Sequence, residues 1–571
     1  MSMCVRYAGE SYTYLLDSVT TDHGRPGTSP MTRYYAAHGT PPGTWLGTGL
    51  TGLNNGEGLT PGSFVTPVQM ERLFANGEDP TTGTPLGQSP HVYTGPADRR
   101  RPVAGFDCTF TAPKSVSVLW ALADDTTREA IYDCHRQAIT DVLTLIERDV
   151  ARTRIGTNGT AQVNVAGVIA AAFDHWDSRE NDPNLHTHVV IANRAQGPDG
   201  RWRTLDSRAL HRAVVAMSER YDTLLADHLT TRLNLTWEYR ERGPRRNPAF
   251  ELTAVPQPLL DLFSRRAAAI DVEVDRLIEK YQTDHGRSPD ATTVIRLRQQ
   301  ATLATREAKE VHSLQELTEE WRTRATTALG TDPEDWFTRV LTAQPGPLPA
   351  APPAPSRLVD DAATMVLAVL SRKRATWSAW NIDAEASRAL KAHRFPTPAA
   401  RDDAVAAVVA AVQARSVLLT PPEVVSTPTA LRRTDGSSAF RPYRGELYTA
   451  QATLDAEHRL LATGRDTTGP TVEPEHLTYA VCSTTRPLLS ARSQGPGVSW
   501  TSSSAPPAPA RPIRWPLSGR RGRPPTAPAP SSASPPLLRP PRSSAPRSGS
   551  RRRTPPSGSW SSTPAPTATS A

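Results

Sequence analysis

The sequence predicts a mixed α/β (α+β) protein with a helical second segment and a disordered tail. Residues 1–345 alternate between helical and strand patterns, with Gly- and Pro-marked turns between them. A Pro/Ala-rich linker at 346–356 leads to an Ala-rich helical segment at 357–475. Residues 476–571 are rich in Pro, Ser and Arg and cannot bury enough apolar surface to offset chain entropy, so we expect disorder there.

The periodicity of apolar residues predicts the elements of the first region in order. Apolar residues recur at helical spacing in "TREAIYDCHRQAITDVLTLIERDVAR" (127–152), which indicates an amphipathic helix. Strands are predicted for "AQVNVAGVIAAAFDH" (161–175) and "HTHVVIANRA" (186–195). Two further helices are predicted at 211–233 and 258–282.

Composition restricts the class of protein. The chain has 571 residues and four cysteines without a C-x-x-C pair, which argues against a disulfide framework and a cysteine-rich zinc site. The first residues have no long apolar core, and no run approaches eighteen apolar residues. We therefore expect no signal peptide, no membrane insertion and a cytoplasmic location.

The formal net charge of +8 arises in the tail. The residues after Glu475 include 13 Arg and no Lys, Asp or Glu, so residues 1–475 carry a formal charge of 8 − 13 = −5. The basic balance of the whole chain is therefore no indication that the globular part binds DNA.

Three histidines occur in "DHWDSRENDPNLHTHVVIANR". His186 and His188 are two residues apart in a predicted strand, so both imidazoles lie on one face and Thr187 lies on the other. The turn formers in "SRENDPN" fold the preceding strand back and bring His175 beside the pair. Three neutral imidazoles that converge in this way bind a divalent metal and leave positions open for water or substrate. The alternative is three ordinary packed or surface histidines.

Six blocks of sequence follow one another along the chain: "GESYTYLLDSV", "RYYAAHGTPPGTWLGTGLTGL", "GFDCTFTAPKSVSVLWALAD", "FDHWDSRENDPNLHTHVVIANRA", "GRWRTLDSRAL" and "QQATLATREAKEVHSLQELTEEWR". Together they resemble the TrwC/TraI-type conjugative relaxases, the MobF class of HUH endonucleases. The resemblance covers about residues 1–345 and continues more loosely to about residue 470. It implies the HUH relaxase fold, an antiparallel sheet flanked by helices with the histidines on central strands.

The resemblance implies metal-dependent, site- and strand-specific nicking and strand transfer at a plasmid transfer origin. A tyrosine attacks the scissile phosphate, keeps the 5′ phosphate as a phosphotyrosine and releases a 3′ hydroxyl. His175, His186 and His188 are the implied ligands of a divalent metal, with Mg and Mn among the candidates. The implied partners are single-stranded plasmid DNA, relaxosome accessory proteins and a type IV secretion coupling protein.

The resemblance also implies roles for four tyrosines and one aspartate. The nucleophile comes from an N-terminal pair, often adjacent in the family but spaced here as Tyr12 and Tyr14. We favour Tyr14, because "YLLDSV" best continues the family pattern, and keep Tyr12 as the alternate; an extended segment would place both on one face. Tyr34 and Tyr35 form a second pair, one member of which performs the second strand transfer. Asp107 orients a ligand histidine and assists the tyrosine; on the sequence alone it reads as a strand-edge carboxylate.

Three further residues are candidate DNA contacts: Lys114, Ser115 and Arg179. Lys114 and Ser115 equally suit the start of a helix that follows Pro113. Arg179 equally suits a structural role in its turn.

Relaxases of this family usually carry a helicase with a P-loop, G-x-x-x-x-G-K followed by Ser or Thr. This chain lacks the motif, so we expect no ATP cofactor and no unwinding. GC-rich codons for "WTSSSAPPAPARP" (500–512) can encode "DVLVGPAGTGKT", a P-loop, in the neighbouring frame. We therefore hypothesise a frameshift between about Thr467 and Gly497, which would make 357–475 a remnant of the region that precedes the helicase. The alternative is an evolved basic tail that binds DNA or a partner, and the nucleotide sequence decides between them.

Two other functions compete with the conjugative relaxase. One is a rolling-circle replication initiator of the HUH class, and the other is an inactive DNA-binding remnant. The order of the blocks and the helicase remnant favour conjugation, and nicking without ATP would distinguish a working relaxase from the remnant.

Overall fold

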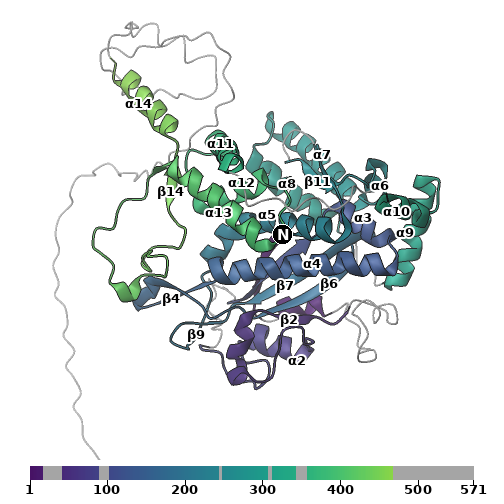
Figure 1. The fold of residues 1–571 in the computed structure, drawn as a ribbon, viewed down its shortest axis with the longest axis horizontal. Helices are drawn as coiled ribbons and strands as arrows, with labels where there is room; N and C mark the ends of the chain where they lie inside the picture. Colours follow the sequence, from purple (N-terminus) through teal and green to yellow (C-terminus); the bar gives the residue numbers. More distant parts are fainter. Residues whose placement is uncertain are drawn as a thin grey trace, which may run out of the picture. The chain divides into compact units, whose positions relative to one another are not determined.

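The computed structural model describes residues 1–8, 10–16, 41–88, 102–242, 247–306, 312–342 and 356–466 (Figure 1). All of them belong to one compact unit, Met1–Ser499. The second tyrosine pair, Tyr34 and Tyr35, lies outside the described residues, as do residues 346–355 and 476–571.

A five-stranded sheet with the order β1-β3-β7-β6-β2 forms the centre of the first region. Its strands are β1 (Ser2–Tyr7), β2 (Thr44–Leu46), β3 (Val103–Thr111), β6 (Ala170–Asp177) and β7 (Pro183–Ala192). Every neighbouring pair is antiparallel. The predicted mixed α/β fold with an antiparallel sheet flanked by helices is confirmed, and β7 lies at its centre.

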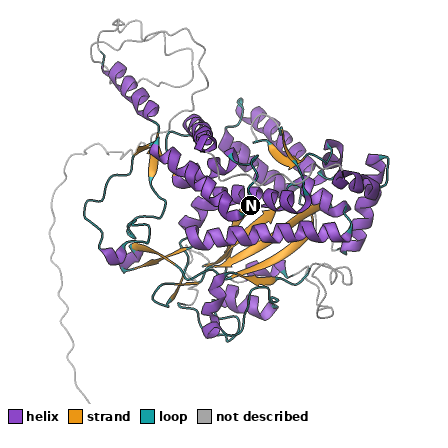
Figure 2. Cartoon of the chain, viewed as in Figure 1, coloured by secondary structure: helices purple, strands orange, loops and turns teal. Residues whose placement is uncertain are grey.

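Apolar side chains cover both faces of this sheet. On one face, α3 (Lys114–Leu122), α4 (Asp125–Leu145) and α5 (Ser207–Leu233) pack against it and form the largest core. On the other face, the short helices η2 (Thr48–Gly56) and α2 (Pro67–Met70) belong to a second core. Figure 1 shows the sheet between these layers, and Figure 2 shows its strands in orange. Because each strand alternates its side chains, one sheet contributes to two cores.

Two predicted elements are interrupted. The predicted strand 161–175 splits into β5 (Ala161–Asn164), which pairs with β4 (Arg152–Ile155), and β6 of the main sheet. Between them the backbone at Gly167 passes so close to Thr48 that a Cβ atom would lie 2.2 Å from the threonine hydroxyl. This close approach diverts the chain, and only glycine permits it.

The predicted helix 258–282 is also two elements, α6 (Gln257–Leu262) and α7 (Arg265–His285). At the break, the hydroxyl of Ser264 donates to the carbonyl oxygen of Leu260 at 2.6 Å, a bond that competes with helix continuation.

The helix predicted at 127–152 is α4, which ends in a π-helical turn, η4 (Ile146–Val150), while the strand predicted at 186–195 corresponds to β7. The helix predicted at 211–233 corresponds to α5.

The described part of the first region contains ten further elements. They are η1 (Glu10–Leu15), η3 (Glu71–Asn76), η5 (Thr157–Gly159), β8 (Ala195–Gln196), β9 (Trp202–Arg203), β10 (Trp237–Arg240), β11 (Ala249–Leu252), α8 (Ala291–Ala304), α9 (Leu314–Leu329) and α10 (Pro333–Thr342).

The second segment contains helices and a small sheet. Its elements are α11 (Ser356–Lys373), β12 (Trp377–Ser378), α12 (Ala379–Ala389), α13 (Pro398–Ala414), β13 (Val417–Leu418), η6 (Thr429–Leu431), β14 (Leu447–Thr449) and α14 (Gln451–Arg465). The three strands pair in the order β12-β14-β13 and were not expected, because two or three residues are too few to reveal a strand period. Buried ion pairs join the segment to α5, including Arg220 with Asp383 and Arg401 with Asp227.

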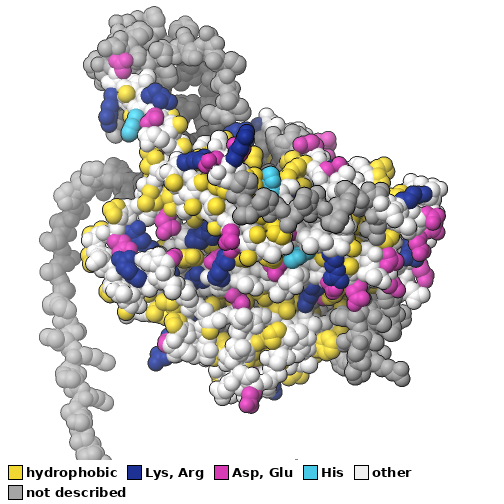
Figure 3. Space-filling view, in the orientation of Figure 1, with side chains coloured by type: hydrophobic (Ala, Val, Ile, Leu, Met, Phe, Trp, Pro, Cys, Tyr) yellow, Lys and Arg dark blue, Asp and Glu magenta, His cyan; other side chains and the backbone are white. Residues whose placement is uncertain are grey.

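The surface carries both signs of charge. On the face seen in Figure 3, Lys and Arg side chains lie among Asp and Glu side chains, in keeping with the charge balance before the tail. Within the part of the chain that the structure describes, no helix has the length and apolar character needed to cross a membrane.

Candidate metal centre

The three predicted histidines come together on one face of β6 and β7. His175 on β6 is the direct cross-strand partner of His186 on β7, and His188 follows two residues later. The ring centroids are 5.1 Å apart for His175 with each of the other two and 5.4 Å apart for His186 and His188. One ring nitrogen from each residue lies within 4.8 Å of the others. The pleat places Thr187 on the opposite face, as predicted.

Hydrogen bonds orient two of these rings toward a common point. The Nδ1 atom of His188 donates to Asp107 Oδ1 at 2.9 Å, and the Nδ1 atom of His186 donates to the backbone carbonyl oxygen of Asn184 at 2.7 Å. Each bond leaves Nε2 with a lone pair for a metal, the usual arrangement around a ligand histidine. A set of three imidazoles fits Zn, Cu, Fe or Ni better than Mg, which prefers oxygen ligands.

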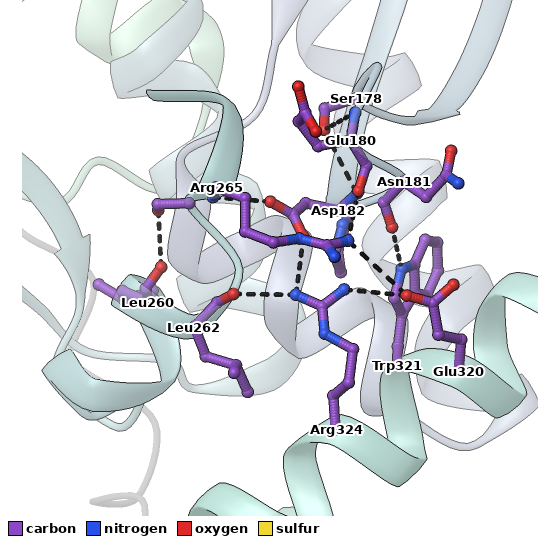
Figure 4. Close-up of polar contacts among 12 residues, drawn as sticks. Ser178, Glu180, Asn181, Asp182, Leu260, Leu262, Arg265, Glu320, Trp321 and Arg324 are labelled. Carbon is purple, nitrogen blue, oxygen red and sulfur yellow. Dashed lines mark hydrogen bonds and ion pairs between the residues drawn. The ribbon is translucent and has the colours of Figure 1, made fainter. Parts of the chain in front are cut away.

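The turn between β6 and β7 is held from outside (Figure 4). The carboxylate of Asp182, which is 1 % exposed, accepts bonds from the Arg265 backbone N–H and the Arg324 guanidinium, both at 2.8 Å. The indole of Trp321 donates to the carbonyl oxygen of Asn181 at 2.7 Å. Helices α7 and α9 thereby fix the hairpin that carries the histidines.

Arg179 lies in the same turn and is partly buried. Burial, and then the positive charges of Arg306 and Arg266, lower its pKa. A contact between Arg179 and DNA stays a prediction.

Tyr14 and Asp107 lie beside His188. The phenol of Tyr14, carried by η1, donates a short hydrogen bond to Asp107 Oδ2, and its ring meets the His188 ring edge-on with centroids 5.9 Å apart. Asp107, carried by β3, is 1 % exposed. The same carboxylate thus contacts both a candidate nucleophile and a candidate metal ligand.

Arg6 on β1 completes this group. Its Nε atom donates to Asp107 Oδ2 at 3.1 Å, its Nη2 atom donates to the Tyr14 oxygen at 2.6 Å, and its guanidinium lies 4.3 Å from the centre of the tyrosine ring. No pattern in the sequence indicated a role for Arg6. It lies two residues after Cys4, and the pairing of Cys4 with Asp107 is visible only in the sheet.

The electrostatics keep the proton on the phenol in this structure. Burial alone would raise the pKa of Asp107, but hydrogen bonds from His188, Tyr14 and Arg6 outweigh it and lower the pKa to about 2. Burial, and then the negative charge of Asp107, raises the pKa of Tyr14 well above its ordinary value, while Arg6 opposes the rise. Asp107 is therefore ionised and accepts the phenol hydrogen bond, while the proton stays on Tyr14.

The segment that carries Tyr12 and Tyr14 is not extended, which was the condition for the two tyrosines to share a face. Tyr12 and Tyr14 lie in η1, a 3-10 helix, so the alternation of an extended segment does not apply. Tyr14 lies against the histidine cluster, with its ring edge-on to the His188 ring.

Ser115 and Lys114, two of the candidate DNA contacts, lie at the start of α3. Ser115 is 0 % exposed, and its hydroxyl accepts from the backbone N–H of Leu252 at 2.7 Å. Lys114 is the first residue of α3, and its Nζ atom donates to the carbonyl oxygen of Pro183 at 2.8 Å. Burial lowers the pKa of Lys114 to about 8, although Asp182 and Glu251 oppose the shift. Both residues lie in the first turn of α3, and their contact with DNA stays a prediction.

The sequence matches a protein-family model and two known proteins over parts of its length. A family model described as TrwC relaxase matches residues 8–328, which is more than half of the 571 residues. The multifunctional conjugation protein TraI of Escherichia coli is 34% identical over 181 residues, 30% of this chain and 10% of TraI. TraI of strain K12 is 40% identical over 112 residues, 19% of this chain and 6% of that protein. The matched segments span a tenth or less of these relatives.

Among solved structures, similarity extends to the conjugative relaxase TrwC in complex with oriT DNA. The metal-free complex is 23% identical, covers 58% of this chain and 99% of that chain, and has a TM-score of 0.44. The copper-bound complex gives the same values.

Proposed function

Because the chain belongs to the TrwC relaxase family, we propose that it is a conjugative relaxase that nicks one DNA strand at a plasmid transfer origin and later rejoins it. Its substrate is single-stranded plasmid DNA at that origin. Relaxosome accessory proteins and a type IV secretion coupling protein are the proposed partners. The observation that carries the proposal is the contact of Tyr14 with Asp107, whose other oxygen orients His188 in the histidine cluster.

The proposed reaction is a transesterification. The oxygen of Tyr14 attacks the scissile phosphorus, a Tyr–O–P bond forms, and the P–O3′ bond breaks. Asp107, which already accepts the phenol hydrogen bond, takes the tyrosine proton, and the departing 3′ oxygen is protonated by water. Because the 5′ phosphate stays on the tyrosine, the strand can be rejoined by the reverse reaction.

The chain's own residues prepare this step. His175, His186 and His188 would hold a divalent metal, which when bound supplies positive charge to the phosphate oxygens. Arg6 holds the Tyr14 oxygen and Asp107 together and stabilises the phenolate as it forms. In this proposal Tyr34 or Tyr35 performs the second strand transfer, Tyr12 is the alternate nucleophile, and Arg179 contacts the DNA backbone.

We further propose that the chain carries no helicase activity and that a frameshift produced the tail. The support is the absent P-loop motif and the neighbouring-frame P-loop that codons for 500–512 can encode. The nucleotide sequence of the gene tests this idea directly. A neighbouring frame that cannot encode the P-loop would rule it out.

The decisive experiment looks for a covalent protein–DNA adduct. The full chain is incubated with single-stranded oligonucleotides from the transfer region of its own plasmid and a panel of divalent metals, without ATP, and analysed on a denaturing gel. We expect an adduct that Tyr14→Phe abolishes and that the matched variant Tyr12→Phe retains. The reverse pattern would make Tyr12 the nucleophile.

Two other outcomes would replace the proposal. An adduct that forms with oligonucleotides from the replication origin, but not with those from the transfer region, would indicate a rolling-circle initiator. A folded protein that forms no adduct with any oligonucleotide or metal would indicate an inactive remnant.

A further inference from the structure

A chain of buried polar side chains lies directly behind the histidines, on the face of β6 and β7 that meets α4 and α5. The hydroxyl of Thr187 donates to Asp174 Oδ1 at 2.5 Å. His135 Nε2 lies 2.8 Å from the Thr187 oxygen, and His135 Nδ1 lies 2.7 Å from the hydroxyl of Tyr221. These side chains are at most 7 % exposed. The chain runs from α5 through α4 to both strands of the metal-binding hairpin.

The direction of every bond in this chain follows from chemistry. An ionised carboxylate only accepts, so Thr187 must donate its single proton to Asp174. The Thr187 oxygen must then accept from His135, which places the imidazole proton on Nε2. His135 Nδ1 is left as an acceptor for the Tyr221 hydroxyl. Burial lowers the pKa of His135 to about 3, which agrees with a neutral ring in one tautomer.

Asp174 is the negative end of the chain and has further donors. The hydroxyl of Tyr132 donates to its Oδ2 atom at 2.8 Å, and the Arg136 guanidinium lies 3.3 Å from Oδ1. Arg136 also donates to the hydroxyl of Thr44 on β2 at 2.9 Å. The carboxylate of Asp174 thus accepts from one strand, β7, and from one helix, α4.

The location of the network links it to the metal centre. Asp174 and Thr187 are direct cross-strand partners. Asp174 precedes His175, and Thr187 separates His186 from His188. The network therefore holds the two residues that directly adjoin all three histidines in the chain.

Stability alone does not account for this arrangement. The neighbours of Thr187 on the same face are Leu185 and Val189, both 0 % exposed, so an apolar residue would suit the site. Buried charged networks are often no more stabilising than well-packed apolar residues. They do specify one arrangement, and a strand slip of a single residue would move every imidazole to the wrong face.

We propose that Thr187 and Asp174 are positioning residues for the metal centre, which hold β6 and β7 in the register and pleat that keep the three imidazoles convergent. The inference rests on the proposed metal-binding function. It concerns residues that touch neither metal nor substrate, and it assigns the chain from Tyr221 to Asp174 a role in metal affinity.

The test compares two substitutions at one position in the full chain. Thr187→Val removes the hydroxyl and keeps the shape, whereas Thr187→Ser keeps the hydroxyl. We expect Thr187→Val to weaken Co²⁺ binding by about 10- to 100-fold, the range for removal of an outer hydrogen bond at a metal site. Thr187→Ser should restore the affinity, and the visible absorption of bound Co²⁺ should be altered in the valine variant alone.

A matched control separates positioning from general stability. Thr153, on β4, is also 0 % exposed, and its hydroxyl donates to the carbonyl oxygen of Thr204 at 2.8 Å. Thr153→Val should lower the melting temperature without a change in Co²⁺ affinity. If Thr187→Val does not fold, Asp174→Asn takes its place with the same expected loss of affinity.

The outcomes distinguish this inference from the proposed function. Wild-type Co²⁺ affinity in a folded Thr187→Val or Asp174→Asn protein would overturn the positioning role, as would an equal loss in Thr153→Val. A wild-type chain that binds no Co²⁺ would overturn both the metal centre and the positioning role. Metal binding without a DNA adduct would overturn only the nicking function.

Discussion

The two faces of the β6–β7 hairpin differ in exposure and in hydrogen bonding. We call the face that carries the three histidines the front, and the opposite face the back. On the front, His186 and His188 are partly exposed, and ionised Asp107 holds one ring while the Nε2 atoms stay available. On the back, the face that packs on α4 and α5, Thr187 and His135 are 0 % exposed. The hydrogen bond between them has one possible direction, from His135 Nε2 to the Thr187 oxygen. Alternate residues of β7 thus have different proposed roles: His186 and His188 bind the metal, and Thr187 positions them. Front substitutions should change the reaction more than the stability, and back substitutions should change both.

The largest expected effect is on the front, in His186→Ala. Removal of one of three imidazoles should lower Co²⁺ affinity by more than about 100-fold, beyond the range for an outer-sphere hydrogen bond. The adduct should disappear with it. The free energy of unfolding should change by only about 1 kcal/mol, because the side chain is partly exposed. His211→Ala, an exposed histidine on α5, is the control, and equal losses in both variants would contradict the assignment.

Asp107→Asn should separate two functions of one side chain. The amide oxygen can still accept from His188, but it is a far weaker base for the Tyr14 proton. We expect adduct formation to slow by about 10- to 100-fold, with a smaller loss of metal affinity. Single-turnover rates and Co²⁺ titration measure the two quantities. Equal losses in both would mean that Asp107 acts through the metal alone.

The pH dependence of stability should report on the back face. His135 has a pKa of about 3 in the folded chain, because of burial first, against about 6.5 when unfolded. Both states are neutral above pH 6.5, so the stabilisation is complete there. Below that pH the unfolded chain alone takes up the proton, and the stabilisation is lost progressively as the pH falls toward 3. Melting temperatures between pH 7 and pH 4, measured with a chelator, should fall more steeply for wild type than for His135→Gln. Parallel slopes would contradict a neutral buried His135.

The smallest expected effect contrasts two threonines. Thr109 lies on the front, with its hydroxyl 3.3 Å from His188 Nδ1, which already donates to Asp107 at 2.9 Å. Thr109→Val should therefore change Co²⁺ affinity by about threefold or less, at the low end for one hydrogen bond. A loss as large as that expected for Thr187→Val would show that the front face is also held by neutral hydrogen bonds, and the contrast between the faces would fail.

Local sequence was sufficient for the features that depend on neighbours in the chain. The i, i+2 spacing of His186 and His188 placed both on one face of a strand, and the turn formers after His175 folded the hairpin that unites them. The mixed α/β class and the helix α4 followed from periodicity in the same way. Tyr14 and Asp107 came from the family resemblance, because no local pattern distinguishes them from packing residues.

Only the tertiary structure decided the contacts between distant segments. Arg6 reaches Asp107 across 101 positions because β1 pairs with β3, and Tyr221 meets His135 because α5 packs on α4. The break of a predicted strand at Gly167 likewise depends on the approach of Thr48. Periodicity records which side of an element is buried, but not which element covers it. The sequence by itself therefore determined the fold class and the histidine cluster, and packing decided which residues orient the imidazoles.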